Sequence, residues 1–273
     1  MRKVPLITFV DIDAVPVPAL EARPGLAVLL ERLARDRISL IFCTQQTRAQ
    51  IESARQAFGV FHPFICEAGS ALFIPERYFG SDLENARAVG GYQAVAFGEP
   101  HDAVATTLHR VSERQNARIV GFNDMSVEQV ARELGLSLLD ARLAMLREYS
   151  EPFRLLNDNP ITERRLFRAL EGSGLTCRRG TDFHLATSAA GPQAAIPLLT
   201  TLYRAAFGSV LTAATLEGIG AAELVPHVDL PLDPIVLDRD DRDAGLTWLE
   251  RIVQEADTAR TSHQSARVAR MAR

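Results

Sequence analysis

Asp11 and Asp13 are the residues near the start of the chain whose type and spacing could carry chemistry. They follow an apolar run, residues 4–10, that predicts a buried strand. Because side chains alternate along an extended chain, two carboxylates one residue apart point the same way and can share a cation or a phosphoryl group. The end of a buried strand is also where α/β enzymes place their active sites. A solvated turn fits the same D-x-D pattern, so the rest of the chain has to decide between the two.

The composition is that of an ordinary folded protein. The chain has 273 residues, of which 47% are hydrophobic, and a formal net charge of −4. This length allows one large domain or two modest ones, and the acidic balance gives no case for a nucleic-acid or membrane partner. We see no leader sequence and no apolar run of membrane-spanning length, so we expect a cytoplasmic protein. The cysteines are odd in number and scattered, which predicts reduced thiols at Cys43, Cys66 and Cys177.

Strand and helix patterns alternate in the first part of the chain. After the first strand, Pro24 and a series of leucines at helical spacing predict a helix. The elements that follow are a strand at 38–44, a helix at 47–58 and short strands at 64–66 and 71–74. This order predicts an α/β fold with a doubly wound parallel sheet.

The character of the sequence changes after residue 80, and we predict an inserted α/β domain there. The predicted division is a first core part at 1–80, the insert at 81–186, a second core part at 187–258 and a basic tail at 259–273. Within the insert, Ser126 predicts a capping box for one helix, and Ser137 predicts a cap for the next. The second core part should contain a helix at 192–207, strands at 209–214 and near 234–237, and a closing helix at 246–256.

Arginine supplies nearly all of the positive charge. Lys3 is the only lysine among 30 basic residues, so a reaction that needs a lysine ammonium has no other source for it. The predicted tail has four arginines and no acidic residue after Asp257. We expect this tail to be disordered, and contact with an anionic surface is the alternative.

Several stretches resemble the haloacid dehalogenase superfamily, in particular its mannosyl-3-phosphoglycerate phosphatase-like branch. In the core they are Asp11-Ile12-Asp13, Thr-Gln-Gln-Thr-Arg-Ala at 44–49 and the stretch at 63–75. In the insert they are Gly-Phe-Asn-Asp-Met-Ser at 121–126 and the stretch at 141–153. The resemblance covers nearly the whole chain and implies a core with an inserted α/β cap.

The resemblance implies phosphoryl transfer through an aspartyl phosphate. Asp11 would be the nucleophile and Asp13 the general acid and base, which is ordinary nucleophilic catalysis by two nearby carboxylates. Thr44, at the end of the second predicted strand, matches the hydroxyl that donates to a phosphoryl oxygen. Magnesium would be bound by the Asp11 carboxylate and the Asp13 backbone carbonyl, with Glu217 as the acidic residue of the fourth motif.

The same resemblance implies contacts to a phosphorylated small molecule from Gln45, Arg48, Arg147 and His184. On spacing alone, Arg147 is typical of a solvated last turn of a helix, and the resemblance is what favours a carboxylate or phosphate contact. For His184, a buried histidine with a hydrogen bond fits the sequence as well as a ligand contact does.

Two motifs depart from the family pattern. The stretch Ser-Ala-Ala-Gly-Pro-Gln at 188–193 lacks the lysine of the third motif. Lys3 cannot replace it, because it begins the strand that Asp11 ends and is on the order of 25 Å away. In the fourth motif Ala221 stands where an acidic ligand is usual, and Ala14-Val15 replace the usual Gly-Thr after the aspartates.

These observations leave alternative functions open. The first is a magnesium-dependent phosphatase acting on a glycosyl-phosphoglycerate or related sugar phosphate. The second is a catalytically inactive relative whose cleft binds a phosphorylated ligand or a partner protein. An adaptor for nucleic acid or an anionic surface has the least support, because the chain is acidic overall.

Overall fold

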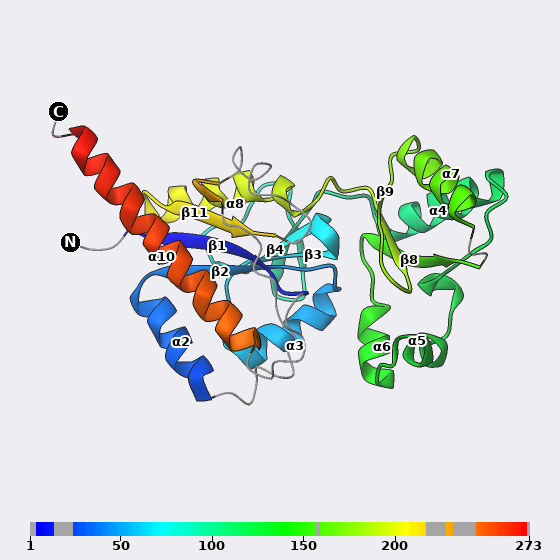
Figure 1. Ribbon diagram of the computed structural model, residues 1–273, viewed down its shortest axis with the longest axis horizontal. Helices are drawn as coiled ribbons and strands as arrows, with labels where there is room; N and C mark the ends of the chain where they lie inside the picture. Colours follow the sequence, from blue (N-terminus) through cyan, green and yellow to red (C-terminus); the bar gives the residue numbers. More distant parts are fainter. Residues whose placement is uncertain (1–3, 14–23, 157–158, 217–227, 232–243, 272–273) are drawn as a thin grey trace.

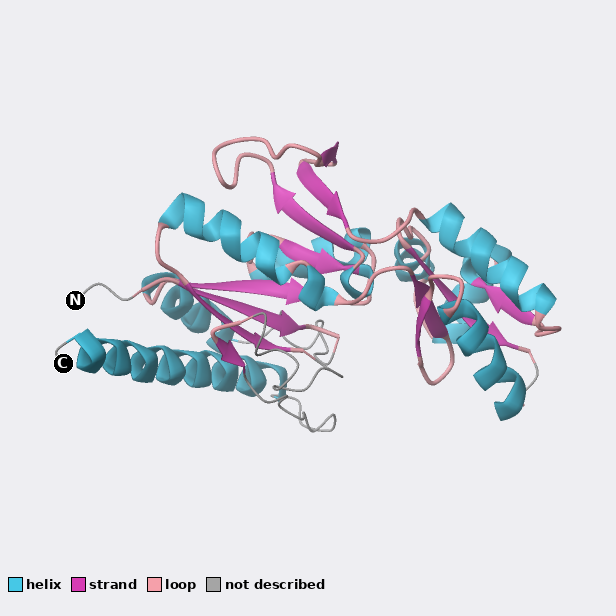
Figure 2. Cartoon of the chain, turned by 90° about the horizontal axis from the view of Figure 1, so that it is seen from above, coloured by secondary structure: helices cyan, strands magenta, loops and turns pink. Residues whose placement is uncertain are grey.

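The computed structural model describes residues 4–13, 24–156, 159–216, 228–231 and 244–271. It has two lobes, which Figures 1 and 2 show from two directions. An eight-stranded sheet forms the centre of the larger lobe, and a four-stranded sheet lies in the smaller lobe. Within the described ranges, no helix combines the length and the apolar character needed to cross a membrane.

The elements alternate along the chain as the sequence predicts. The strands of the larger sheet are β1 (Leu6–Asp11), β2 (Ile38–Cys43), β3 (Phe64–Cys66), β4 (Ala71–Pro75), β5 (Arg87–Val89), β6 (Tyr92–Ala96), β11 (Leu211–Thr215) and β12 (Leu230–Pro231). The helices of this lobe are α2 (Pro24–Arg35), α3 (Arg48–Phe58), α8 (Ile196–Phe207) and α10 (Ala244–Met271), with 3-10 turns η1 (Glu67–Gly69) and η3 (Pro192–Ala194).

The larger sheet has the order β12-β11-β1-β2-β3-β4-β6-β5. Strand β1 pairs in parallel with β2 and β11, and β2 pairs in parallel with β3. Alternate residues of β1 serve the two faces: Leu6 and Val10 pack in a cluster with α2, α3 and α10, whereas Ile7 and Phe9 pack in a cluster with α8. Helices therefore cover both faces, which confirms the predicted doubly wound α/β core.

The helix ends follow the local capping chemistry. Thr47 caps α3 through a capping box with Gln50, and Gly59 ends the helix in the left-handed conformation, with φ of 64°. Ser126 forms the capping box predicted for the helix at 127–134, and Ser137 caps the next helix. These short-range signals were readable because each involves residues three or four positions apart.

The predicted start of the insert at residue 81 is wrong. Strand β6 pairs antiparallel with β4, and β5 pairs antiparallel with β6, so both extend the larger sheet. The glycines in this stretch include Gly90 and Gly91, whose positive φ values of 55° and 83° form the turn between β5 and β6. The glycine-rich stretch is thus a hairpin of the core, and the smaller lobe begins only near Glu99.

The predicted disordered tail is also wrong. Helix α10 continues to Met271 instead of ending near residue 256. Arg260 is buried, and its Nη1 donates to the carbonyls of Asp36 (2.7 Å) and Val4 (3.2 Å), while Nη2 pairs with Asp257. The apolar residues of this helix stop near residue 256, which is why the sequence predicts its end there. The buried guanidinium of Arg260 keeps the helix packed against the larger lobe beyond that point. The strand expected near 234–237 lies outside the described residues.

The smaller lobe is an antiparallel sheet with helices on it. Its elements are α4 (His101–Arg114), β7 (Ile119–Gly121), η2 (Phe122–Asp124), α5 (Val127–Leu134), α6 (Leu138–Ala144), β8 (Ser150–Leu155), α7 (Pro160–Glu171), β9 (Thr176–Arg178) and β10 (His184–Thr187). The sheet order is β7-β8-β10-β9. Phe153 and Ala186 pack against α4 and α7 on one face, and Phe122 packs with α5 and α6 in a separate cluster.

Replacing Arg260 with alanine should destabilise the larger lobe. The change removes the donors for two backbone carbonyls, and we expect a loss of about 2 kcal/mol in the free energy of unfolding, measured by urea denaturation. Arg251→Ala, at an exposed position of the same helix, is the control and should change the value by no more than about 0.5 kcal/mol. Equal losses for the two variants would contradict the assigned role of Arg260.

Candidate active site

Two predicted catalytic carboxylates and their partners meet at the ends of β1 and β2. Asp11 ends β1 opposite Cys43, the last residue of β2, and Thr44 follows Cys43 directly. The Thr44 hydroxyl donates to Oδ1 of Asp13, and the Gln45 N–H donates to Oδ2 at 2.6 Å. The Asp13 N–H in turn donates to Oδ1 of Asp11 at 3.0 Å. The structure thus brings these residues together at the carboxyl ends of adjacent parallel strands, where α/β folds place their sites.

The orientation of Thr44 is set by backbone contacts. Its hydroxyl oxygen accepts the Gln46 N–H at 3.0 Å, so its own proton is directed to Asp13. Its backbone N–H donates to the carbonyl of Ile65 at 3.0 Å, in line with the pairing of β2 and β3. Because both groups of Thr44 are fixed by neighbouring backbone, the Asp13 carboxylate has a preorganised partner.

Arg147 approaches these strand ends from the smaller lobe. Its Nη1 donates to the Gln45 carbonyl at 2.7 Å, and its Nε donates to the Ala144 carbonyl at 2.9 Å. Burial lowers the pKa of this guanidinium, and nearby carboxylates, including those of Glu67 and Asp13, act in the opposite direction. The charge of Arg147 therefore lies within electrostatic range of Asp13.

Arg178 brings a second positive charge from the smaller lobe. In strand β9 Cys177 packs toward α4 and α7, so the neighbouring Arg178 side chain points to the opposite face of the sheet. The pKa of Cys43 is raised by burial and by the carboxylates of Asp11 and Asp13, and Arg178 lowers it. The effect of Arg178 on Cys43 is the smallest of these four, so its guanidinium lies in the electrostatic surroundings of the strand ends without a direct contact to Cys43.

A fully buried carboxylate, that of Glu67, joins the two lobes. Its Oε1 accepts the Glu148 N–H at 2.9 Å, and its Oε2 accepts the Tyr149 N–H at 3.0 Å and the Ser150 hydroxyl at 2.7 Å. Glu67 adopts a left-handed backbone conformation, with φ of 50°, which is unusual for a non-glycine residue. The three hydrogen bonds that this one carboxylate accepts hold the segment after Arg147 against the core.

Arg48, predicted as a ligand contact, forms ion pairs with carboxylates other than those of the two aspartates. Its Nε lies 2.9 Å from Glu148 Oε1, and its Nη1 lies 2.9 Å from Glu52 Oε1. Arg87, at the edge of the larger sheet, lies 2.7 Å from the other oxygen of Glu148. Both arginines therefore form ion pairs between the lobes around one carboxylate.

His184 also lies elsewhere. Its ring packs against Phe153 and Phe167, with centroids 5.5 and 5.0 Å away, on the face of the smaller sheet that α4 and α7 cover. Burial lowers its pKa, and its buried Nδ1 has no hydrogen-bond partner among the described residues. The alternation of side chains along β10 points it away from the face that carries Arg178.

The oxygen atoms at the strand ends are compatible with magnesium. Magnesium is commonly held by one or two carboxylates together with water and substrate phosphate oxygens, and the Asp11 carboxylate with the Asp13 carbonyl could supply such a set. Within the described ranges, no group of three or more His, Cys, Asp or Glu side chains is placed to hold a metal ion. Glu217, expected to complete the metal shell, lies outside the described residues, as do Ala14, Val15 and Ala221.

The stretch that matches the third motif lies at the junction between the lobes. The Ser188 hydroxyl accepts the Glu99 N–H at 2.6 Å, so the outgoing and returning chains meet here. A Cβ on Gly69 would lie 2.2 Å from the carbonyl carbon of Gly191, which only glycine allows. Since Ala68 donates its N–H to the Thr44 carbonyl at 3.0 Å, this junction is one short turn from the site.

Known structures with this architecture define the class of fold. A phosphatase of the haloalkanoate (HAD) enzyme superfamily from Bacteroides thetaiotaomicron covers 91% of this chain and 95% of its own, with a TM-score of 0.55 and 12% identity. A HAD subclass IIB sugar phosphatase covers 90% of this chain and 98% of its own, with a TM-score of 0.52 and 12% identity. At this level of identity, these similarities show that the chain shares the fold of these structures.

Sequence relatives define the family more closely. The glucosyl-3-phosphoglycerate/mannosyl-3-phosphoglycerate phosphatase of Methanococcoides burtonii is 33% identical over 224 residues, which is 82% of this chain and 80% of that protein. The phosphatase of the same description from Persephonella marina is 26% identical and covers 74% of each chain. No family model matches the sequence. The chain belongs to the glucosyl-3-phosphoglycerate/mannosyl-3-phosphoglycerate phosphatase family, which confirms the resemblance found in its motifs.

Replacing Glu67 with glutamine should loosen the contact between the lobes. Glutamine keeps the volume but turns an NH₂ group toward donors, so we expect a loss of about 2 kcal/mol in unfolding free energy. Hydrogen exchange at the amides of Glu148 and Tyr149 should become faster. Glu76→Gln, at an exposed position of the same lobe, should leave both measurements unchanged. Unaltered protection of these two amides in Glu67→Gln would show that Glu67 does not hold the segment.

Proposed function

We propose that this protein is a phosphohydrolase that releases phosphate from a glycosyl-3-phosphoglycerate or a related sugar phosphate. Its relatives in Methanococcoides burtonii and Persephonella marina are named as phosphatases of such compounds, which favours an enzyme over an inactive relative. The observation that carries the proposal is the pair of carboxylates at the end of β1, with Asp13 held by Thr44 and Gln45. This arrangement gives two carboxylates different surroundings, as a nucleophile and an acid–base pair require.

The proposed reaction has two displacements at phosphorus. An oxygen of Asp11 attacks the phosphorus, the bond from phosphorus to the ester oxygen of the substrate breaks, and protonated Asp13 gives its proton to that oxygen. Asp13 then removes a proton from water, whose oxygen attacks the phosphorus and releases the Asp11 carboxylate and phosphate. The Asp13 N–H orients Oδ1 of Asp11, and Thr44 and Gln45 keep Asp13 within reach of the leaving group.

Magnesium would be held by the Asp11 carboxylate and the Asp13 backbone carbonyl. Bound there, it would offset negative charge on the phosphoryl group.

Positive charge from the smaller lobe supports the proposal despite the missing third-motif lysine. Arg147 is tied to the Gln45 carbonyl, and Arg178 acts on Cys43 beside Asp11. Guanidinium groups can neutralise phosphoryl charge and bind phosphate or carboxylate oxygens in pairs. We propose these two arginines as the substrate-facing cations of the site, together with Gln45, in place of Arg48 and His184.

The Asp11→Asn variant tests the nucleophile. Phosphate release should be measured with magnesium on glucosyl-3-phosphoglycerate, mannosyl-3-phosphoglycerate and simple sugar phosphates. We expect the wild type to release phosphate from a glycosyl-3-phosphoglycerate and Asp11→Asn to be slower by about 10³-fold or more. Asp82→Asn, an exposed carboxylate of the same lobe, is the control. Equal rates for wild type and Asp11→Asn would refute the proposed function and leave the inactive ligand-binding relative as the better description.

Neighbouring arginines provide a matched test of the positive charge. Arg178→Ala should lower kcat/KM by about 10- to 100-fold, because it removes a cation facing the strand ends. Arg179 lies on the other face, 3.1 Å from Glu163 and stacked over Phe167, so Arg179→Ala should keep the wild-type value. If both variants lost activity equally, a general disturbance of β9 would be the better explanation.

A further inference from the structure

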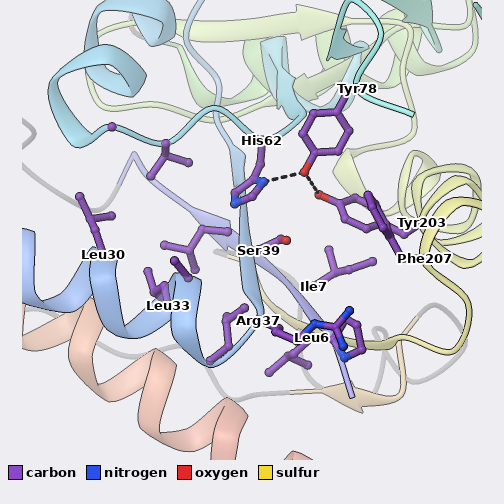
Figure 3. Close-up of a pocket in the computed structure, with 16 residues that line it drawn as sticks. Leu6, Ile7, Leu30, Leu33, Arg37, Ser39, His62, Tyr78, Tyr203 and Phe207 are labelled. Carbon is purple, nitrogen blue, oxygen red and sulfur yellow. Dashed lines mark hydrogen bonds between the residues drawn. The ribbon is translucent and has the colours of Figure 1, made fainter. Parts of the chain in front are cut away.

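A cavity of about 370 Å³ lies at the opposite end of the sheet from the two aspartates. Figure 3 shows it between α2, the start of β2 and the end of α8. Leu6, which lines it, begins β1, and Asp11 ends the same strand, so the two sites are about 17 Å apart. The cavity is therefore separate from the proposed active site.

The cavity arises because β3 is short. Only Phe42 and Cys43 at the end of β2 pair with β3, and the segment that precedes β3 turns away with Val60 and His62. The first half of β2 thus faces open space where a longer strand would have continued the sheet. Leu30 and Leu33 of α2 form an apolar wall on one side of this space.

A chain of hydrogen bonds ends in this space. Tyr203 bonds to Tyr78 at 2.8 Å, and Tyr78 bonds to Nδ1 of His62 at 2.6 Å. Burial raises the pKa of both tyrosines, so both hydroxyls stay protonated and each can donate. Burial and the charge of Arg55 lower the pKa of His62 to about 4, so its imidazole is neutral near pH 7. A neutral imidazole that accepts at Nδ1 carries its own proton on Nε2.

The Nε2 atom of His62 has no hydrogen-bond partner among the residues that the structure describes, and Figure 3 shows it directed away from Tyr78 into the cavity. Phe207, which also lines the cavity, is 48% exposed. A partly open cavity of this size, with mostly apolar walls, the polar side chains of Arg37 and Ser39 in its lining and one imidazole nitrogen directed into it, has the features of a small-molecule site.

We propose that this cavity is a second ligand site, for a compact apolar molecule that carries one hydrogen-bond acceptor. The apolar walls bind the body of the molecule, and the Nε2–H of His62 donates to its acceptor oxygen. The site uses no residue of the proposed phosphatase chemistry.

A pair of fluorinated probes tests the proposal by ligand-observed ¹⁹F NMR on the full chain. The probe 4′-fluoroacetophenone has a carbonyl acceptor, and 1-ethyl-4-fluorobenzene has the same ring without one. We expect the ketone to bind about fivefold more tightly, the contribution of one hydrogen bond. Absence of ketone binding, or equal binding of the two probes, would overturn the proposal.

Variants locate the binding. Leu30→Trp fills the cavity and should abolish binding, whereas Val28→Trp, at a position of the same helix that is 68% exposed, should not. His62→Phe keeps a ring but removes Nε2, and should bind the two probes equally. Asp11→Asn should bind the ketone as the wild type does, and loss of binding there would place the probe in the active site. Undiminished binding to a folded Leu30→Trp variant, with the melting temperature of Val28→Trp, would also overturn the proposal.

Discussion

A buried carboxylate needs hydrogen-bond donors to replace water, and the donors to Glu67 belong to the segment that enters the other lobe. The same residue donates its N–H to the Gln46 carbonyl at 3.1 Å, so one short turn connects the site to both lobes. Arg147 precedes Glu148 directly, and its position over Gln45 follows from the way Glu67 holds that segment. The rest of the site depends on this buried acid.

The chemistry of the site is therefore divided between the lobes. The larger lobe supplies the carboxylates and the hydroxyl at the ends of β1 and β2. In the proposed site, the smaller lobe supplies positive charge through Arg147 and Arg178, in a chain whose third motif has no lysine. A phosphoryl group in transfer needs a nucleophilic carboxylate on one side and positive charge near its oxygens. A site whose carboxylates and cations come from different lobes is therefore complete only when the lobes are in contact. The ion pairs of Glu148 with Arg48 and Arg87 hold the same arrangement from outside.

The sequence was sufficient for features that depend on near neighbours or on motif matches. The buried strand before Asp11, the caps at Ser126 and Ser137 and the family itself could be read from it. It failed where distant residues decide, as at Arg260, whose two backbone partners, the carbonyls of Val4 and Asp36, lie more than 200 positions away. The sequence could not tell which of the neighbours Arg178 and Arg179 lies on the sheet face toward the larger lobe, and the same holds for Phe183 and His184. The pairing of β9 with β10 decides this. Glu67 lay within a quoted motif, but its partners belong to the insert, which no local signal reveals.

The junction at Ser70 places both ends of the insert at one residue. Its carbonyl accepts the N–H groups of Phe97 (2.8 Å) and Gly98 (3.1 Å), and its hydroxyl lies 2.6 Å from that of Thr187. The chain therefore leaves and re-enters the larger lobe at nearly the same point, as a side branch does. Evolution can lengthen, shorten or exchange such a branch without altering the register of the strands that carry Asp11 and Thr44. A change in the insert can therefore alter what surrounds the proposed active site while the paired strands that carry it stay as they are.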